Sequence, residues 1–355
     1  MYTARMGEEK VYRGLQAMRG MASMLVLVMH SALYYAIRLS PERFPWDWQR
    51  GARGVDLFFV LSGFMMVYSS EKLFGNPNGW RLFAQRRVIR IVPMYWIATT
   101  IKLIAFLAAA GLLMHSQFDW GRAISSYFFI PYRSSEGIEP LLIVGWTLNF
   151  EMFFYAIFTF ALKMRVNIYI FVAAILFPLA IASVFRQPDW PGASFYLDPI
   201  VLEFFFGMLI AKWVLSGKRM HPAIAAFMLV GGLVWLLFLP IPKPYILSAN
   251  GFAAAAAIWG TAALEPRLKW LPKWTLYLGD ISYVLYLFHP FIAPAGPYIL
   301  KRVHMHNPLL SVVLSVAAAV AAACLIHQYL ERPITERLRK WTGQRRVVMA
   351  DLATR

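Results

Sequence analysis

Residues 13–30 read RGLQAMRGMASMLVLVMH, and this stretch decides how the rest of the chain is interpreted. It begins a long apolar segment, yet it contains the ionisable residues Arg19 and His30. Ionisable residues are rare within membrane-spanning segments, and where they occur they usually have a function. The eleven positions from one to the other correspond to about three helical turns, or roughly 16 Å. Eleven steps of 100° return to within about 20° of the start, so both side chains share one face of a helix. The stretch therefore predicts a membrane helix that carries a functional site.

The composition indicates a polytopic membrane protein. Of its 355 residues, 59% are hydrophobic and only 15% are charged, whereas soluble domains carry about 25% charged residues. We expect an all-α bundle of about ten transmembrane helices that forms a single domain over residues 1–355. Each span is near the ~20 residues that cross the hydrocarbon core. The expected spans are 14–37, 54–71, 89–113, 142–163, 167–186, 195–215, 222–241, 246–264, 274–297 and 308–330.

The net charge of +17 does not indicate nucleic-acid binding, because the basic residues fall in short clusters between apolar runs. Lysine and arginine are concentrated in both terminal segments and in the loops on their side of the ten spans. By the positive-inside rule, this places both termini in the cytoplasm. Residues 331–355 are expected to form a basic cytoplasmic tail that begins as a helix at the membrane surface. The apolar patch at 123–131 is too short to span and is expected to be interfacial or re-entrant.

Arg19 and His30 each have a structural interpretation beside the functional one. Arg19 can extend its guanidinium to the cytoplasmic interface, and His30 can hydrogen-bond to a neighbouring helix. In the functional interpretation, a neutral imidazole in an apolar bundle acts as a general base. With the termini inside, Arg19 lies near the cytoplasmic face and His30 lies in the outer half of the membrane.

A basic cluster, RRVIR at 86–90, is expected at the cytoplasmic start of the third span, on the side of Arg19. Arg86 and Arg90 share a helix face, as do Arg87 and Arg90. Guanidinium groups suit phosphate oxygens because two N–H groups can donate in parallel. The alternative is a positive-inside anchor that binds no ligand.

Two carboxylates are expected at the depth of His30. Glu151 lies in WTLNFE, after Trp146 and Asn149, and a carboxylate among these aromatic residues must be paired or protonated. An arginine on another helix is its simplest partner. Asp56 either orients a histidine or only caps the second span.

Two later motifs complete the set of candidates. GDISYVLYLFHP at 279–290 contains Tyr283 and His289, and YLERP at 329–333 contains Glu331. Each residue also has a purely structural explanation. His289 precedes Pro290 and could mark a helix kink, and Glu331 could pair with a cytoplasmic arginine. We see no ligand cluster for a metal and expect none to be needed.

Together these motifs resemble those of the membrane-bound acyltransferase-3 family. They are Arg19 with ten residues before His30, GVDLFFVLSGF at 54–64, RRVIRIVP at 86–93, WTLNFEMFFY at 146–155 and the two motifs above, in that order over nearly the whole chain. Within the family, the chain most resembles the branch that O-acetylates exopolysaccharides such as succinoglycan. Its WTLNFEMFF motif and the expected absence of an esterase-like domain favour that branch.

The resemblance implies a multi-pass O-acetyltransferase of the bacterial inner membrane. It makes His30 the catalytic histidine, and it makes Arg19, Arg86, Arg87 and Arg90 the residues that engage cytoplasmic acetyl-CoA. We expect Glu151 or Asp56 to orient or charge-balance His30. The acceptor is expected to be a sugar hydroxyl of a polysaccharide, or of its lipid-linked oligosaccharide, outside the membrane. Substrate binding or structural support is expected from His289, Tyr283, Trp146, Asn149 and Glu331.

Other functions are compatible with the sequence. The acceptor could be O-antigen, peptidoglycan or a small molecule, and the donor could be succinyl-CoA. A proton-coupled transporter of an acidic solute would use His30 and Glu151 for protons, although hydropathy shows no obvious inverted repeat. A polysaccharide-export subunit without activity is a third possibility. Acyl transfer could be direct or could pass through an acyl-His30 intermediate.

Overall fold

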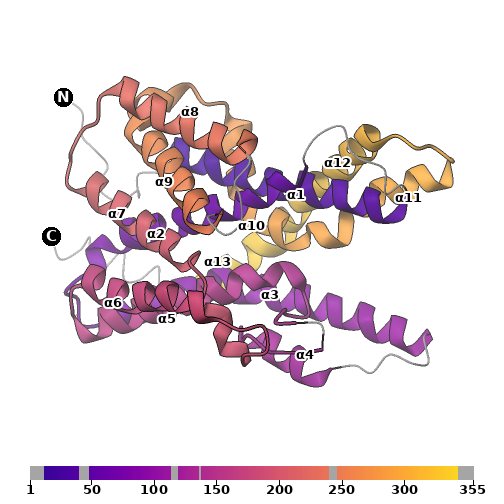
Figure 1. Ribbon diagram of the computed structural model, residues 1–355, viewed down its shortest axis with the longest axis horizontal. Coiled ribbons are helices and arrows are strands. Elements are labelled where there is room, and N and C mark those ends of the chain that lie inside the picture. Colours follow the sequence, from indigo (N-terminus) through magenta and orange to yellow (C-terminus); the bar gives the residue numbers. More distant parts are fainter. Residues whose placement is uncertain (1–11, 40–47, 113–118, 136, 240–245, 343–355) are drawn as a thin grey trace.

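The computed structural model describes residues 12–39, 48–112, 119–135, 137–239 and 246–342, which are helical almost throughout (Figure 1). Thirteen α-helices follow one another in this part of the chain, with short 3₁₀ turns between some of them. The described residues contain no strand beyond one isolated bridge between Ser134 and Gly137. The predicted all-α class is therefore confirmed.

Every expected span overlaps one of these helices. The three remaining helices are short: α4 (Trp120–Tyr127), α11 (Ala295–Arg302) and α13 (Arg332–Trp341). The helices that overlap the spans are α1 (Arg13–Arg38), α2 (Gly54–Ser70), α3 (Gly79–Leu112), α5 (Trp146–Met164), α6 (Ile168–Ala182), α7 (Val201–Leu215), α8 (Pro222–Phe238), α9 (Ile246–Leu264), α10 (Lys273–Ile292) and α12 (Pro308–Ile326).

Seven segments of the described chain are long and apolar enough to cross a membrane. They contain α1, α2, α3, α5, α6, α10 and α12. The helices α7 and α8 have only 15 and 17 residues, which gives about 22–26 Å at 1.5 Å per residue against a hydrocarbon core of about 30 Å. The structure therefore supports a multi-pass membrane protein, whereas the count of ten spans stays a prediction.

The third helix begins earlier than predicted. α3 starts at Gly79 rather than at residue 89, so the arginines at 86, 87 and 90 lie inside the helix and not at its start. Arginine and glutamine are good helix formers, which is why the polar stretch before the apolar run continues the same helix. This correction places the guanidinium groups beside α2 and α5.

The first helix lies at the centre of the molecule, against α2, α9, α10 and α12 (Figure 1). Its contact with α10 is made by backbone. A Cβ atom at Gly279 would lie 2.2 Å from the Gln16 carbonyl oxygen, and one at Gly20 would lie 2.9 Å from Leu278 Cβ. Only glycine permits this approach, which is the usual role of small residues between membrane helices. The side chains of α1 are thereby held at a fixed height relative to those of α10.

The second helix is packed against α7 in the same way, but reciprocally. A Cβ at Gly63 would lie 1.9 Å from the Phe204 carbonyl oxygen, and a Cβ at Gly207 would lie 2.0 Å from the Val60 carbonyl oxygen. Each glycine thus brings its Cα close to a carbonyl of the other helix, a geometry that favours weak Cα–H···O contacts. On its other face, α2 borders the cavity described below.

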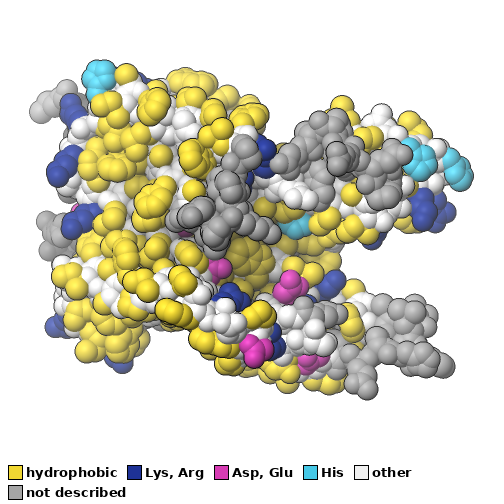
Figure 2. Space-filling model, in the orientation of Figure 1, with side chains coloured by type: hydrophobic (Ala, Val, Ile, Leu, Met, Phe, Trp, Pro, Cys, Tyr) yellow, Lys and Arg dark blue, Asp and Glu magenta, His cyan; other side chains and the backbone are white. Residues whose placement is uncertain are grey.

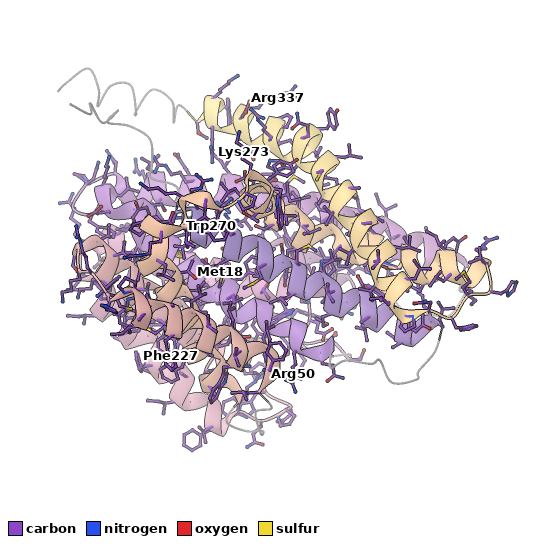
Figure 3. All side chains as sticks on the ribbon, turned by 90° about the horizontal axis from the view of Figure 1, so that it is seen from above. Met18, Arg50, Phe227, Trp270, Lys273 and Arg337 are labelled. Atoms are coloured by element: carbon purple, nitrogen blue, oxygen red, sulfur yellow. The ribbon has the colours of Figure 1, made fainter. Side chains whose placement is uncertain are left out.

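The exterior is apolar, as lipid contact requires. Phe227 on α8 is 78% exposed and lies at the edge of the bundle, whereas Met18 of α1 is buried near its middle (Figure 3). Hydrophobic side chains cover most of the left-hand part of the molecule in Figure 2. On the right, the same view shows a wide notch between the part with α11 and α12 and the part with α3 and α4.

Candidate active site

An inner cavity of about 90 Å³ lies between α1, α2, α3, α5 and α10. Its charged lining consists of three guanidinium groups, from Arg19, Arg87 and Arg90, and one carboxylate, from Glu151. Phe58, Phe59 and other apolar side chains form most of the remaining wall, together with the hydroxyl groups of α5 and α10. A narrow cavity with an excess of positive charge suits a thin, anionic ligand.

Arg19 is placed by a chain of polar side chains that starts on α10. The Asp280 carboxylate accepts a hydrogen bond from Gln16 Nε2 at 2.6 Å, and Gln16 Oε1 accepts one from Arg19 Nη1 at 3.4 Å. The aspartate of the GDIS motif therefore orients a residue of α1. Gln16 and Asp280 were not singled out from the sequence, because their roles depend on two helices that lie side by side.

The arginines of α3 differ in their surroundings. Arg87 Nη2 donates to Ser69 Oγ at 2.6 Å, and its guanidinium lies 5.2 Å from the ring centre of Phe83 and 5.5 Å from that of Tyr155. Arg90 lines the cavity one turn further along the helix. Arg86 is half-buried and is not part of the cavity wall. Two of the three predicted arginines thus meet Arg19.

Glu151 projects from α5 into the same cavity. One oxygen, Oε1, accepts hydrogen bonds from Ser62 Oγ at 3.0 Å and from the Tyr155 hydroxyl. Glu151 also lies close enough to Arg19 to attract its positive charge. The carboxylate is therefore placed where it partly balances the charge of the arginines.

Two hydroxyl groups close one end of the inner cavity. Tyr286 on α10 and Thr147 on α5 are hydrogen-bonded at 2.9 Å, and the Tyr286 hydroxyl also donates to the Val144 carbonyl at 2.9 Å. Both residues line the cavity. Neither histidine lines the cavity, but the ring of Tyr286 lies 6.0 Å from that of His289, so the histidine pair adjoins these hydroxyl groups. Tyr283 lines the cavity as well, and its hydroxyl donates to the Ile91 carbonyl at 2.7 Å.

His30 and His289 face one another, with ring centres 4.7 Å apart. His30 Nδ1 lies 3.0 Å from the Val26 carbonyl oxygen. A carbonyl only accepts, so Nδ1 carries the proton and Nε2 keeps its lone pair. His30 is half-buried and can be reached by a ligand, whereas His289 is 1% exposed. His30 Nε2 is therefore the accessible base of the pair.

The proline after His289 sets the tautomer of that histidine. Pro290 has no N–H, so the carbonyl four residues before it, that of Tyr286, loses its helical donor. His289 Nδ1 occupies that place and donates to the Tyr286 carbonyl at 2.7 Å. His289 Nε2 is then an acceptor, and among the described residues it has no hydrogen-bond partner although it is buried. The His-Pro pair thus leaves a lone pair on a ring whose centre lies 4.7 Å from that of His30.

Three predicted site residues lie elsewhere. Asp56 faces Glu203 of α7 rather than a histidine; the carboxyl groups interact, and both side chains are buried. Glu331 pairs with His327 at 2.6 Å, at a π-helical turn before α13. Asn149 is buried on α5 but does not line the inner cavity. Glu203 was not among the predicted site residues. Like Glu151, it is an ionisable residue within an apolar run, VLEFFF, and this pattern alone could have identified it.

Comparison with known proteins identifies the family. Residues 12–328 match the acyltransferase domain of the acyltransferase-3 family. The chain belongs to this family. The acyltransferase is 35% identical over 324 residues to the exopolysaccharide production protein ExoZ of Rhizobium meliloti, with 86% of the chain and 94% of the relative covered.

Two more distant relatives carry enzyme names. The acyltransferase is 25% identical to the putative peptidoglycan O-acetyltransferase YrhL of Bacillus subtilis, over 90% of its own length and 54% of the relative. It is 22% identical to the acyltransferase MdmB of Streptomyces mycarofaciens, over 84% of its length and 83% of the relative. No solved structure matches the chain significantly. The family and these relatives support an enzyme, an acyltransferase, over a transporter or an inactive export subunit.

Proposed function

We propose that this acyltransferase moves an acetyl group from cytoplasmic acetyl-CoA to a sugar hydroxyl of an exopolysaccharide, or of its lipid-linked repeat, outside the bacterial inner membrane. The observation that carries the proposal is the inner cavity, which joins three arginines at one end to the hydroxyl groups beside the two histidines at the other. The likeness to an exopolysaccharide production protein over most of both chains supports the class of acceptor.

The donor enters from the arginine side. Arg87 and Arg90 contact the phosphates of CoA, and Arg19 contacts the same ligand further in, because guanidinium forks match phosphate and carbonyl oxygens. The extended arm of CoA then lies along α1. The spacing of roughly 16 Å from Arg19 to His30 is bridged by that arm. Both chain termini are cytoplasmic in this proposal, in agreement with the concentration of lysine and arginine in their loops.

His30 acts as the general base. Its Nε2 takes the proton of the sugar hydroxyl while the hydroxyl oxygen attacks the thioester carbonyl carbon. The carbon–sulfur bond then breaks, and the CoA thiolate receives the proton from the His30 imidazolium, so that an ester and free CoA are formed. His289 keeps a lone pair on Nε2, and its ring centre lies 4.7 Å from that of His30, so this neutral ring stabilises the positive charge of the imidazolium. Glu151 limits the excess of positive charge around the donor.

The donor end is tested by two variants in one helix. Arg90 lines the inner cavity and Arg86, one turn before it, does not, so Arg86→Gln is the matched control for Arg90→Gln. We expect Arg90→Gln to raise the KM for acetyl-CoA at least about tenfold, because a charge-assisted hydrogen bond is lost. Arg86→Gln is expected to leave that KM within about threefold of the wild-type value.

The histidine is tested by its chemistry. His30→Ala is expected to lower kcat by at least about 10²-fold, since general-base catalysis contributes about that much or more. Release of free CoA at the wild-type rate by purified His30→Ala protein, with acceptor present, would refute the role of His30. An exopolysaccharide that keeps all its acetyl groups after deletion of the gene would refute the acceptor.

A further inference from the structure

A second, larger cavity lies at the end of the bundle where α5 begins. Its volume is about 350 Å³, within the range of about 300–1,000 Å³ of small-molecule pockets. We call it the outer pocket. Its walls come from the segment between α4 and α5, the segment between α6 and α7, and the first two turns of α5.

The outer pocket adjoins the active-site end of the inner cavity. Trp146 and Phe150 line the outer pocket, whereas Thr147 and Glu151 line the inner cavity, so the start of α5 forms a wall that the two share. Thr147 is hydrogen-bonded to Tyr286, one helical turn from His289. The outer pocket thus lies on the side of the histidines, opposite to the arginines that would hold the donor.

The wall between the two cavities is made of aromatic rings, some of which line the inner cavity and others the outer pocket. The ring of Trp146 lies 6.2 Å from that of Phe59, which lines the inner cavity, and 6.0 Å from that of Phe150. Phe195, from the other segment, packs on Phe150 at 4.4 Å. Trp146 is half-buried, so part of its surface remains available to a ligand. An apolar ring face beside polar groups is the usual lining of a specific small-molecule site.

The charged lining is balanced. It consists of two guanidinium groups, from Arg133 and Arg186, and two carboxylates, from Glu139 and Asp198. Arg133 Nε donates to the Trp190 carbonyl at 2.6 Å, which holds its fork in place. Asp198 Oδ1 accepts from the Ile200 backbone N–H at 2.9 Å. Burial raises the pKa of Asp198, and the nearby Arg186 partly offsets that rise.

These groups fit a sugar ring. Hydroxyl groups both donate and accept, so they can donate to carboxylates and accept from guanidinium groups in one site, and a balanced site requires no net charge on the ligand. The apolar face of a pyranose matches the exposed part of an indole ring. The inner cavity has an excess of positive charge, which suits the anionic donor instead.

We propose that the outer pocket binds a pyranose unit of the acceptor glycan through Trp146, Arg133, Arg186 and Asp198, and so presents a neighbouring hydroxyl to His30. This proposal rests on the proposed function, because it presumes that the acceptor is a glycan. It predicts that residues far in sequence from the catalytic histidine set acceptor specificity.

The test uses full-length protein in lipid nanodiscs, acetyl-CoA, and oligosaccharide repeat units from the cell's own exopolysaccharide after removal of their esters with mild alkali. Arg186→Gln and Asp198→Asn are the pocket variants. The control is Arg302→Gln, which removes a positive charge at the end of α11, outside the pocket. Binding of the oligosaccharide without acetyl-CoA is measured in parallel with turnover.

We expect both pocket variants to raise the acceptor KM and the oligosaccharide Kd at least about tenfold, with the KM for acetyl-CoA unchanged. Arg302→Gln is expected to change neither constant. Wild-type turnover with unchanged acceptor constants in both pocket variants would overturn this inference and leave the proposed function standing. Binding that the pocket variants abolish, without turnover in the wild type, would support the pocket and refute the enzymatic proposal. A wild type that neither binds nor acylates the oligosaccharide overturns both.

Discussion

The contact between α2 and α7 gives the sharpest test of how the active site is built. Gly63→Ala would place a Cβ atom 1.9 Å from the Phe204 carbonyl oxygen, whereas real Cβ contacts are essentially never shorter than 3.0 Å. The helices must therefore separate by at least about 1.1 Å, the difference between the two distances. Because the obstructing atom is backbone, no side-chain rotation can relieve the clash.

The cost is that of overpacking a core, about 1–3 kcal/mol. At about 2–4 °C per kcal/mol for a medium-sized domain, we expect the unfolding midpoint to fall by roughly 2–12 °C. The displaced α2 also presses Phe58, Phe59 and Ser62 towards Glu151, because these residues line the inner cavity. A shift of about 1 Å near reacting groups can lower kcat/KM by up to about 10²-fold.

The assay is thermal unfolding of purified protein in detergent, followed by circular dichroism, together with initial rates for acetyl-CoA. Gly231→Ala is the matched control, since Gly231 lies inside α8 and a Cβ there would meet nothing within 4 Å. It should be neutral or stabilising by up to about 1 kcal/mol, the helix propensity of alanine over glycine. If Gly63→Ala unfolds at the temperature of Gly231→Ala, the backbone contact of α2 and α7 is not what holds this wall of the cavity.

Three further changes test other parts of the site. Pro290→Ala restores an N–H that competes with His289 for the Tyr286 carbonyl. We expect the unfolding temperature of this variant to rise and its kcat to fall several-fold. An unchanged kcat would show that the tautomer of His289 does not matter for catalysis. Asp56→Asn should keep kcat within about threefold, because Asp56 faces Glu203; loss of activity with normal folding would instead support a role beside His30. Burial raises the pKa of Asp198, so the folded state binds the proton of this carboxyl group more tightly than the unfolded state does. The stability of the wild-type protein therefore falls as the pH rises through the ordinary carboxyl range. Asp198→Asn should therefore gain stability relative to wild type as the pH rises above the ordinary carboxyl range. A difference in unfolding midpoint that does not change with pH would contradict this.

Much of the site was accessible from the sequence because its signals are local. Arg19, His30, Glu151 and the arginine cluster stand out as ionisable residues within apolar runs, and such residues have few reasons to be there other than pairing or function. Helix periodicity placed Arg19 and His30 on one face, and in the structure both lie towards α10. The same reasoning applied to Glu203 would have found a partner for Asp56.

The helix boundaries were less accessible. The predicted start of α3 is ten positions too late, because the polar residues before the apolar run are also good helix formers and extend the helix back to Gly79. The short length of α7 and α8 was missed because the apolar stretch at each place continues beyond the helix.

The sequence by itself determined the helical class, the membrane setting, the resemblance to one family and the separation of about three turns between Arg19 and His30. Those properties follow from composition and from the fixed rise and rotation of a helix, which act within one segment. Only the tertiary structure decided which segments meet. It brought His289 against His30 across 259 positions (289 − 30), selected Arg87 and Arg90 over Arg86, turned Asp56 towards Glu203, and formed the outer pocket from two loops. These pairings depend on how closely the helices approach one another. Glycine contacts such as that of Gly20 with Gly279 permit the close approach, and they join residues that are far apart in the sequence.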